Sequence, residues 1–331
     1  EELSNQMTVS TSILDAVSAK VPSFSPTRQK LTGAGETMRG RDPLYMIDGV
    51  PQSNPLRDGS RDGVTLDPAV IERVEVLYGA NAIQGIGGTG GVINYVTLSP
   101  SEERGLQARL EAATVLNDFG KVDVVLGIAG ETRGAFYDGD GNRIGIDNVQ
   151  GDLQDSKSLN LFAKAGVDFD EKTRAQVMVN IFDVDGEGDY VPIDGDRALG
   201  IPTSAIKGSF DGEPTYNTVR TLSADFTRSE LAGGTLAVQG FYQDFKAVFG
   251  GGIFATFQDP AIDPTGNLFD QSANQSEKYG LKFSYSRQNL FVPGLSAILG
   301  LDYLHDKTEQ VLVQTGRSWV PPTSFESWAP F

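Results

Sequence analysis

Side chains that could do chemistry are few in this 331-residue chain, which has no cysteine and a single histidine, His305. The absence of cysteine excludes a thiol nucleophile, a disulfide framework and a Cys-ligated metal site. Because no Gly-x-Ser-x-Gly elbow accompanies the lone histidine, a Ser-His-Asp hydrolase has little support, and we expect His305 to be a rim residue at the end of a strand. A glycosidase carboxylate pair stays open, because such a pair is defined by separation in three dimensions.

A glycine-rich run at residues 85–90 matches the G-x-G-x-x-G pattern of dinucleotide-binding folds. That function requires a helix to follow, whose N-terminal amides hold the pyrophosphate. The following residues, 92–97, are rich in β-branched and aromatic side chains and predict a strand instead. We therefore interpret the glycines as a tight turn that needs positive φ and close backbone approach.

Two acidic stretches are candidate calcium sites. Residues 138–142 open like an EF-hand loop, but Arg143 stands where the pattern requires glycine and Val149 where it requires glutamate. Residues 183–196 carry six carboxylates and no basic residue. A solvated acidic loop is the alternative there, and apart from such a Ca²⁺ site we expect no bound cofactor.

Charge and hydropathy exclude two further classes. A formal net charge of -17 argues against a nucleic-acid partner, because phosphate binding depends on clustered Lys and Arg. Only 39% of residues are hydrophobic, and no run approaches the roughly 20 apolar residues of a membrane-spanning helix. A membrane β-barrel stays open, because its strands alternate apolar and polar residues and look hydrophilic on average.

The first hundred or so residues predict a small α+β domain. Apolar residues recur at helical spacing over residues 10–21, and Pro22 ends the pattern. Strand-like runs follow at residues 44–47, 74–78 and 92–97. A polar linker at residues 98–104 then separates this domain from the rest of the chain.

Beyond the linker, long runs alternate apolar and polar residues, as at 159–169, 175–181, 279–285 and 295–303. Such runs approach the length that a tilted strand needs to cross a bilayer. Short turns at 170–172, 230–234 and 289–294 alternate with long polar loops at 135–156, 185–214, 250–275 and 309–325. This alternation is typical of outer-membrane barrels. A soluble sandwich is the alternative, and it would bury Leu159, Leu281 and Leu299, which a barrel exposes.

One stretch departs from the alternation of strand directions. We expect a single strand at 105–115 and an outward strand at 122–133, joined by a short link at 117–121. The strand at 105–115 would then run inward, so it would have to start on the outer side. The linker at 98–104 that precedes it should, however, lie on the inner side. We therefore predict that an outward strand and its loop are missing near residues 113–116, where the numbering would close over an omitted segment.

The most informative residues are two blocks, ETMRGRDPLYMIDGVP from Glu36 and IERVEVLYGANAIQGIGGTGGVINYVT from Ile71. In order and spacing they resemble the signature of the plug domain of TonB-dependent outer-membrane receptors. Downstream, residues 136–142, 147–148, 278–282 and 300–305 are similar, more loosely, to the ferric-aerobactin branch of siderophore receptors.

The resemblance implies an α+β plug at residues 1–98, with a truncated N-terminus, inside a transmembrane antiparallel barrel that begins at residue 99. Barrels of the family have 22 strands, whereas we expect only about 8 or 9 here, so we expect an incomplete barrel. No TonB box is recognisable before the helix. We expect a fragment of a bacterial outer-membrane protein.

The implied function is transport, with no bond made or broken, so we do not expect an enzyme. The receptor would bind an extracellular ferric siderophore and import it with energy from the TonB-ExbB-ExbD complex, in contact with outer-membrane lipid and lipopolysaccharide. The alternatives are a receptor for a cobalamin or an oligosaccharide, or a soluble β-rich binding protein or enzyme.

The resemblance also places the site in the apical plug loops at residues 27–30, 41–43 and 52–61. The candidate ligand-binding residues are Arg28, Lys30, Arg41, Asp42, Gln52, Arg57 and Arg61. Their basic side chains suit the carboxylate or hydroxamate oxygens of a ferric chelate. The alternative is that these bases pair with lumen carboxylates to seat the plug. The candidate plug-barrel contacts are Arg39, Glu72, Arg73 and Glu75. Tyr78 stands where the family often has arginine, which weakens the case for one plug-barrel ion pair.

Overall fold

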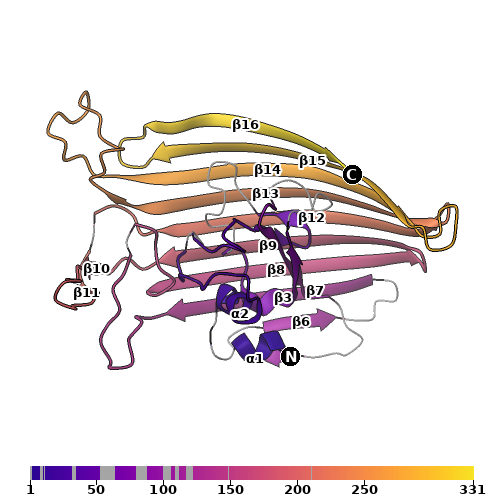
Figure 1. Cartoon of the computed structure of the whole chain (residues 1–331), viewed down its shortest axis with the longest axis horizontal. Coiled ribbons are helices and arrows are strands. Elements are labelled where there is room, and N and C mark those ends of the chain that lie inside the picture. Colours follow the sequence, from indigo (N-terminus) through magenta and orange to yellow (C-terminus); the bar gives the residue numbers. More distant parts are fainter. Residues whose placement is uncertain are drawn as a thin grey trace.

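The structure is a computed structural model with two parts, a small domain and a long curved sheet against which it packs (Figure 1). It describes residues 2–7, 10, 12–31, 35–52, 64–79, 88–99, 106–108, 112–116, 122–147, 149–209 and 211–331. No helix among these residues is long and apolar enough to cross a membrane.

The small domain, here called the plug, contains two helices, a 3-10 turn and a four-stranded sheet. Its elements are α1 (Glu2–Met7), α2 (Ile13–Lys20), β1 (Leu44–Ile47), β2 (Val50–Pro51), η1 (Pro68–Val70), β3 (Ile71–Tyr78) and β4 (Gly91–Thr97). The sheet order is β2-β1-β4-β3, with β1 parallel to β4 and the other pairs antiparallel. The predicted helix and the three predicted strands are confirmed, while α1 and β2 were not predicted.

The large sheet has ten antiparallel strands in sequence order. They are β5 (Leu106–Ala108), β6 (Ala112–Leu116), β7 (Val122–Arg133), β8 (Ser156–Asp170), β9 (Thr173–Gly186), β12 (Tyr216–Leu231), β13 (Gly234–Gly252), β14 (Asp270–Arg287), β15 (Ala297–Leu312) and β16 (Ser318–Pro330). A separate hairpin of β10 (Tyr190–Ile193) and β11 (Ser204–Lys207) rises from the connection between β9 and β12. The long loops gather at one end of the sheet, the long-loop end, and the tight turns at the other, the short-turn end (Figure 1).

Alternation along the strands gives the large sheet two different faces. On the outward face, Leu159 is 45% exposed, Leu281 50% and Leu299 64%. On the inward face of β8, Asn160 and Phe162 are buried against the plug. The exposed leucines confirm the expectation for a barrel wall and contradict a soluble sandwich, which would bury them.

Three expectations about the strands were wrong. The single strand expected at 105–115 is the antiparallel pair β5 and β6, which raises the strand count from 8 or 9 to ten and restores the alternation of directions. The loop expected at 309–325 is a short connection between Leu312 and Ser318, because polar residues there continue β15 and β16. His305 therefore lies within β15 and not at a strand end. Residues 109–111 and 117–121 lie outside the described residues, so the omitted segment stays a prediction.

The described end of the glycine-rich run shows the close backbone approach that was expected, and the positive φ lies at the next residue, Gly91. A Cβ on Gly90 would lie 2.6 Å from the carbonyl oxygen of Arg41, and one on Gly91 would lie 2.5 Å from that of Leu77. Gly91 also has a φ of +137°, which side chains rarely allow. The strand β4, and not a helix, follows the glycines, so the dinucleotide pattern lacks the helix that would bind a phosphate. Residues 85–87 lie outside the described residues.

The core joins the two parts. Val125, Phe162 and Met178 of the large sheet are buried in one cluster with plug residues such as Val17 and Tyr45. In β1 all four residues are buried, because the strand is covered on both faces. The plug is therefore packed on the inward face of the sheet by an apolar contact, and the polar contacts described next surround it.

Candidate functional site

The first apical segment, residues 27–31, is held from inside the plug by Glu36. The Arg28 N–H donates to Glu36 Oε1 at 2.7 Å, while the Arg28 side chain is exposed. Glu36 is only 1% exposed. Burial raises the pKa of its carboxyl group above the usual value, although the Arg28 N–H lowers it. This buried carboxyl group thus fixes the backbone from which Arg28 projects.

The same segment is joined to the long loop between β7 and β8. The Lys30 ammonium forms ion pairs with Asp152 and, at 3.5 Å, with Asp147. Backbone hydrogen bonds run beside them, from Leu31 N–H to the Gly151 carbonyl oxygen at 3.0 Å. Burial alone would raise the pKa of Asp147, but the Gln150 N–H and the Lys30 ammonium outweigh it and lower that pKa. Lys30 therefore links the plug to the barrel.

The second apical segment is a tight turn in the R-G-R block. Arg39 has a φ of 55°, and the Met38 N–H donates to the Arg41 carbonyl oxygen at 2.8 Å. The Arg39 guanidinium lies over the Tyr78 ring, 5.5 Å from its centroid, so Tyr78 has a partner inside the plug. The turn leaves the Arg41 side chain exposed and Asp42 half-buried.

The D-G-V-P block forms the turn between β1 and β2 and is held by charge. Asp48 accepts a hydrogen bond from the Thr97 N–H at 2.9 Å. Its Oδ2 lies 3.0 Å from Lys164 Nζ of β8, and the two side chains are 12% and 3% exposed. A buried ion pair thus crosses from the plug turn to the barrel wall.

Further side chains of the wall hold the backbone of this turn. Lys282 Nζ donates to the Gly49 carbonyl oxygen at 2.7 Å, and Gln239 Nε2 donates to that of Asp48 at 2.8 Å. Four residues further along β13, towards the long-loop end, Gln243 Nε2 donates to Gln52 Oε1 at 2.6 Å. Gln52 is buried. These donors from β13 and β14 satisfy the carbonyl groups that the turn exposes.

A second row of wall amides holds the plug segment before η1. Asn160 Oδ1 accepts from the Asp67 N–H at 2.8 Å, and Asn160 Nδ2 donates to Asn180 Oδ1 at 2.7 Å. Asn180 Nδ2 in turn donates to the Thr65 carbonyl oxygen at 3.2 Å. Both asparagines are fully buried. The chain of amides therefore runs from β9 through β8 to the plug backbone.

The third member of this row is Asn217 of β12. Its Nδ2 lies 3.2 Å from the Leu31 carbonyl oxygen and 3.4 Å from that of Val64. Asn160, Asn180 and Asn217 are here called the asparagine row. It joins three strands to two plug segments without any net charge, so water can replace each contact at little cost.

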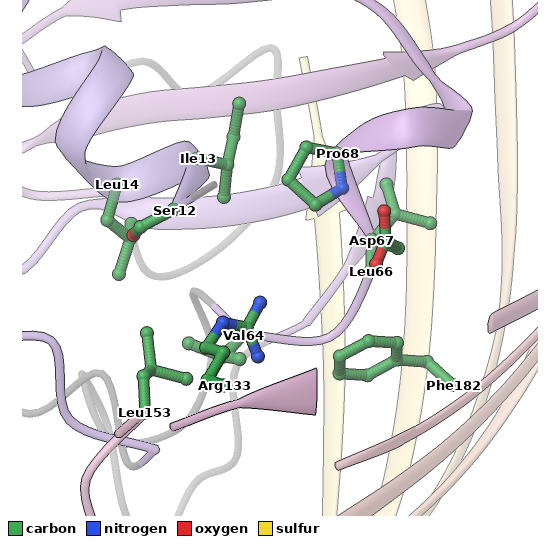
Figure 2. A pocket seen from close by; sticks show the side chains of 10 residues that line it. All are labelled: Ser12, Ile13, Leu14, Val64, Leu66, Asp67, Pro68, Arg133, Leu153 and Phe182. Carbon is green, nitrogen blue, oxygen red and sulfur yellow. The ribbon is translucent and has the colours of Figure 1, made fainter. Parts of the chain in front are cut away.

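The contact between helix α2 and the barrel leaves a small cavity of about 20 Å³ (Figure 2). Ser12, Ile13 and Leu14 border it on the helix side, and Leu153 and Phe182 border it on the barrel side. Such a volume suits a single water molecule. The plug is thus closely packed against β7–β9.

The candidate residues fall into groups. Arg28, Arg41 and Asp42 lie in the two described apical segments, and ligand contact by them stays a prediction. Lys30 and Gln52 are engaged with barrel side chains. Arg57 and Arg61 lie outside the described residues. Among the described residues, Arg73 pairs with Glu72 and Glu75 on its own strand, Glu75 accepts from Asn94, and Glu72 accepts from the Ser99 N–H of the linker. A barrel contact for Arg39, Glu72, Arg73 and Glu75 stays a prediction.

The two acidic stretches differ from calcium loops. The Asp138 carboxylate accepts from Asn142 Nδ2 and from the N–H groups of Asp140 and Asn142, which lowers its pKa. It is therefore occupied by its own turn. Among the described residues, no group of three or more His, Cys, Asp or Glu could hold a metal ion. In the second stretch, Glu187 pairs with Lys157, and Asp189 lies 3.9 Å from Lys207.

The residues that seat the plug were missed from the sequence. They are the asparagine row together with Lys164, Gln239, Gln243, Lys282 and Lys278, whose ammonium group donates to the Pro51 carbonyl oxygen at 3.2 Å. The sequence did contain a signal for them, because each is a polar residue at those alternate positions of a strand that face away from the lipid. Lumen-facing positions of a water-filled barrel are polar as well, so the pattern alone does not distinguish a plug contact from a solvated wall.

Comparison with known proteins gives matches over both parts. Residues 1–92 match the family model "TonB-dependent Receptor Plug Domain". The chain is 31% identical over 285 residues to the rhizobactin receptor of Rhizobium meliloti (strain 1021), a match covering 79% of this chain and 37% of that protein. It is 26% identical over 334 residues to the ferric aerobactin receptor of Klebsiella pneumoniae, covering 92% and 43%. The chain thus spans less than half the length of these curated relatives.

Solved structures share the fold. The hemophore receptor HasR of Serratia marcescens superposes with a TM-score of 0.68 at 14% identity, over 98% of this chain and 47% of that one. The unliganded ferric citrate transporter FecA superposes with a TM-score of 0.63 at 14% identity, over 92% and 49%. At such identities the likeness concerns the arrangement of plug and barrel strands alone.

Proposed function

We propose, from the premise that this chain belongs to the TonB-dependent receptors of the bacterial outer membrane, that the whole protein binds an extracellular ferric siderophore and imports it. Energy for import would come from the TonB-ExbB-ExbD complex acting on the plug. The observation that carries the proposal is the plug seated on the inward face of an antiparallel wall, in a chain whose curated matches include a rhizobactin receptor and a ferric aerobactin receptor.

The basic side chains of the two apical segments favour an anionic ligand. Arg28 and Arg41 are both exposed, and each stands on a backbone fixed from within the plug. A guanidinium group can donate two parallel hydrogen bonds to a carboxylate or hydroxamate. The acidic residues of the β9–β12 connection would repel an anion, but Glu187 and Asp189 have lysine neighbours that offset part of their charge.

The seat of the plug suits a displacement that must be reversible. Many of its contacts are single hydrogen bonds made by neutral side-chain amides, which water can replace, while lysines make others. Because the apolar contact involves few wall residues, notably Val125, Phe162 and Met178, moving the plug would expose limited apolar surface. Passage of a ligand therefore requires rearrangement of the plug, with no covalent step.

Binding by the detergent-solubilised full-length receptor tests the proposal against a panel of ferric siderophores, a cobalamin and an oligosaccharide. We expect a ferric siderophore to bind best. Arg28→Ala and Arg41→Ala should each weaken it by about tenfold or more, since a hydrogen bond to a charged group contributes roughly 1.5–3 kcal/mol. Arg228→Ala, which removes an ion pair with Asp170 at the short-turn end, is the control. Unchanged affinity in both apical variants would refute their assignment.

A further inference from the structure

The plug is held in different ways by two sides of the described wall. On the β7–β9 side, apolar wall residues share one buried cluster with the plug core, namely Val125, Phe162 and Met178. The cavity at the contact of α2 with the barrel is only about 20 Å³. On the β13–β14 side, the turn between β1 and β2 is held by hydrogen bonds to its carbonyl oxygens from Gln239, Lys278 and Lys282. The plug is thus closely packed on one side and attached by single polar contacts on the other.

The turn on the polar side leads into β2, which is the shortest strand of the plug sheet and lies at its edge. Among the described residues, β2 pairs with β1 at two positions, Met46 with Pro51 and Ile47 with Val50, whereas β3 pairs with β4 at seven. Gly49 precedes β2 at a φ of +81°, which glycine adopts without steric cost. Few backbone hydrogen bonds would therefore break if residues 49–51 moved away from the wall.

A hollow of about 450 Å³ lies between this turn and the short-turn end of the wall. Asp48 and Gly49 border it on the plug side. Inward side chains of β12–β15 border it on the wall side, among them Asp225, Thr227, Gln239, Lys282, Ser284 and Asp302. Pockets that hold small-molecule ligands measure roughly 300–1,000 Å³. The hollow therefore has room for a ligand of the size of a siderophore, which the water-sized cavity on the β7–β9 side does not.

The charges of the hollow differ from those of the apical segments. Two wall carboxylates, Asp225 and Asp302, accompany one ammonium group, that of Lys282. Asp302 is the cross-strand neighbour of Lys282, and its Oδ2 has no hydrogen-bond partner among the described residues. The apical segments, in contrast, expose Arg28 and Arg41. An anionic chelate is thus attracted at the apical side and held weakly in the hollow, which suits passage and not retention.

We propose that the β1–β2 turn is the gate of the transport path, and that the ferric chelate passes between this turn and β13–β14 into the hollow. Gly49, Val50 and Pro51 leave the donors of the wall, while α2 and β1 stay packed against β7–β9. The short turns of an outer-membrane barrel face the periplasm, so the hollow lies on the side to which the ligand is delivered. The inference rests on the proposed function and names the route within it.

Thiol labelling during import tests the gate, because none of the 331 residues is cysteine. Val50→Cys and Val125→Cys are a matched pair: both valines are 0% exposed, one in β2 and one at the apolar contact of β7. The full-length receptor is expressed in cells that import iron as the ferric siderophore selected by the binding panel. N-ethylmaleimide should then label the Val50→Cys variant about tenfold faster than without siderophore, and Val125→Cys should stay protected. Equal labelling of both variants would show that the whole plug leaves, and unchanged labelling of Val50→Cys would show that the turn does not move; either result would overturn the proposal.

Filling the hollow tests the route itself. The double variant Thr227→Trp, Ser284→Trp should import the siderophore about tenfold more slowly, since a passage filled by side chains admits no ligand of this size. Its siderophore binding should be unchanged, which also shows that it is folded. Leu281→Trp, on the outward face of β14, is the control. Normal import by the double variant, or an equal loss in Leu281→Trp, would refute the route. Failure of the unaltered receptor to bind any ferric siderophore would count against the proposed function alone.

Discussion

Lys164 Nζ of the barrel wall lies 3.0 Å from Asp48 Oδ2 of the plug, and both side chains are largely shielded from solvent. Asp48 also sits at a φ of 46° in the turn before β2, a conformation that aspartate tolerates better than most residues. The D-G pair of the sequence signature thus provides both the tight turn and the charge that joins the plug to β8.

Lys164→Met should loosen the plug turn, because it leaves the buried Asp48 carboxylate without its charge partner. Removing one member of a buried ion pair costs roughly 3–5 kcal/mol. In the full-length receptor, amide hydrogen exchange in residues 44–52 should accelerate by about a hundredfold or more. Lys172→Met, which removes an exposed pair with Glu230, should leave it unchanged. Equal protection in the two variants would contradict this role.

Asn180→Ala should release the segment before η1. It leaves the Thr65 carbonyl oxygen and one Asn160 donor without their partner, and an unsatisfied buried group costs about 1–3 kcal/mol. Exchange of the amides at 64–71 should therefore accelerate. Gln176→Ala is the control: Gln176 lies on the same face of β9, nearer the short-turn end, and has no hydrogen bond to the described plug residues. If Gln176→Ala has the same effect, the asparagine row is not the seat.

The junction of two outer loops should depend on pH through Asp155, which lies just before β8. Burial raises its pKa to about 6, with the neighbouring Asp189 and Glu187 carboxylates adding to the shift and Arg143 opposing it. Because this pKa is above the ordinary value of 3.8, the folded junction favours the protonated form. The protonated Asp155 carboxyl group therefore stabilises the folded junction fully below pH 3.8, and this contribution is lost as the pH rises through about 6.

The measurement is amide exchange at Glu187, whose N–H donates to the Asp155 carbonyl oxygen at 2.8 Å. Its protection factor, corrected for intrinsic exchange, should be greater near pH 5 than near pH 7.5. Asp155→Asn should abolish the difference. Asp138→Asn, in a turn whose carboxylate has a lowered pKa, should keep it. A pH-independent protection factor in the unaltered protein would refute the prediction.

Gly91→Ala should destabilise the plug sheet, because the new methyl group would meet the Leu77 carbonyl oxygen at a strained φ. Backbone strain of this kind costs about 1–3 kcal/mol before the collision is counted. Tryptic cleavage after Arg73 in β3 should accelerate in the full-length receptor. Gly240→Ala in β13, where a Cβ would meet nothing within 4 Å, is the control. Similar cleavage rates for both variants would show that the close approach is unimportant.

Local pattern explains how much of the fold was predictable. The helix α2 and the lipid-facing leucines follow from periodicity, and the strand β1 follows from a short apolar run, both of which depend only on neighbouring residues. The errors lie where the chain reverses. Residues 106–108 and 112–116 pair as two antiparallel strands, and residues 309–325 continue two strands, because pairing with distant strands, and not composition, decides where a strand ends.

The site was predictable in part for a similar reason. Basic residues in the apical segments could be identified from the sequence, but their partners could not. Lys30 could have faced a ligand, yet the fold brings Asp152 and Asp147 to it from the loop after β7. Gln52 likewise meets Gln243, nearly two hundred residues away in sequence.

The sequence by itself determined that this chain has a plug signature, alternating strands and a charged apical region, because each is a property of residues close together in the chain. Only the tertiary structure decided which polar residues of the wall hold the plug and which face the lipid. That choice depends on cross-strand register: Lys278 and Glu277 are neighbours in sequence, but they lie on opposite faces of β14 and meet different surroundings.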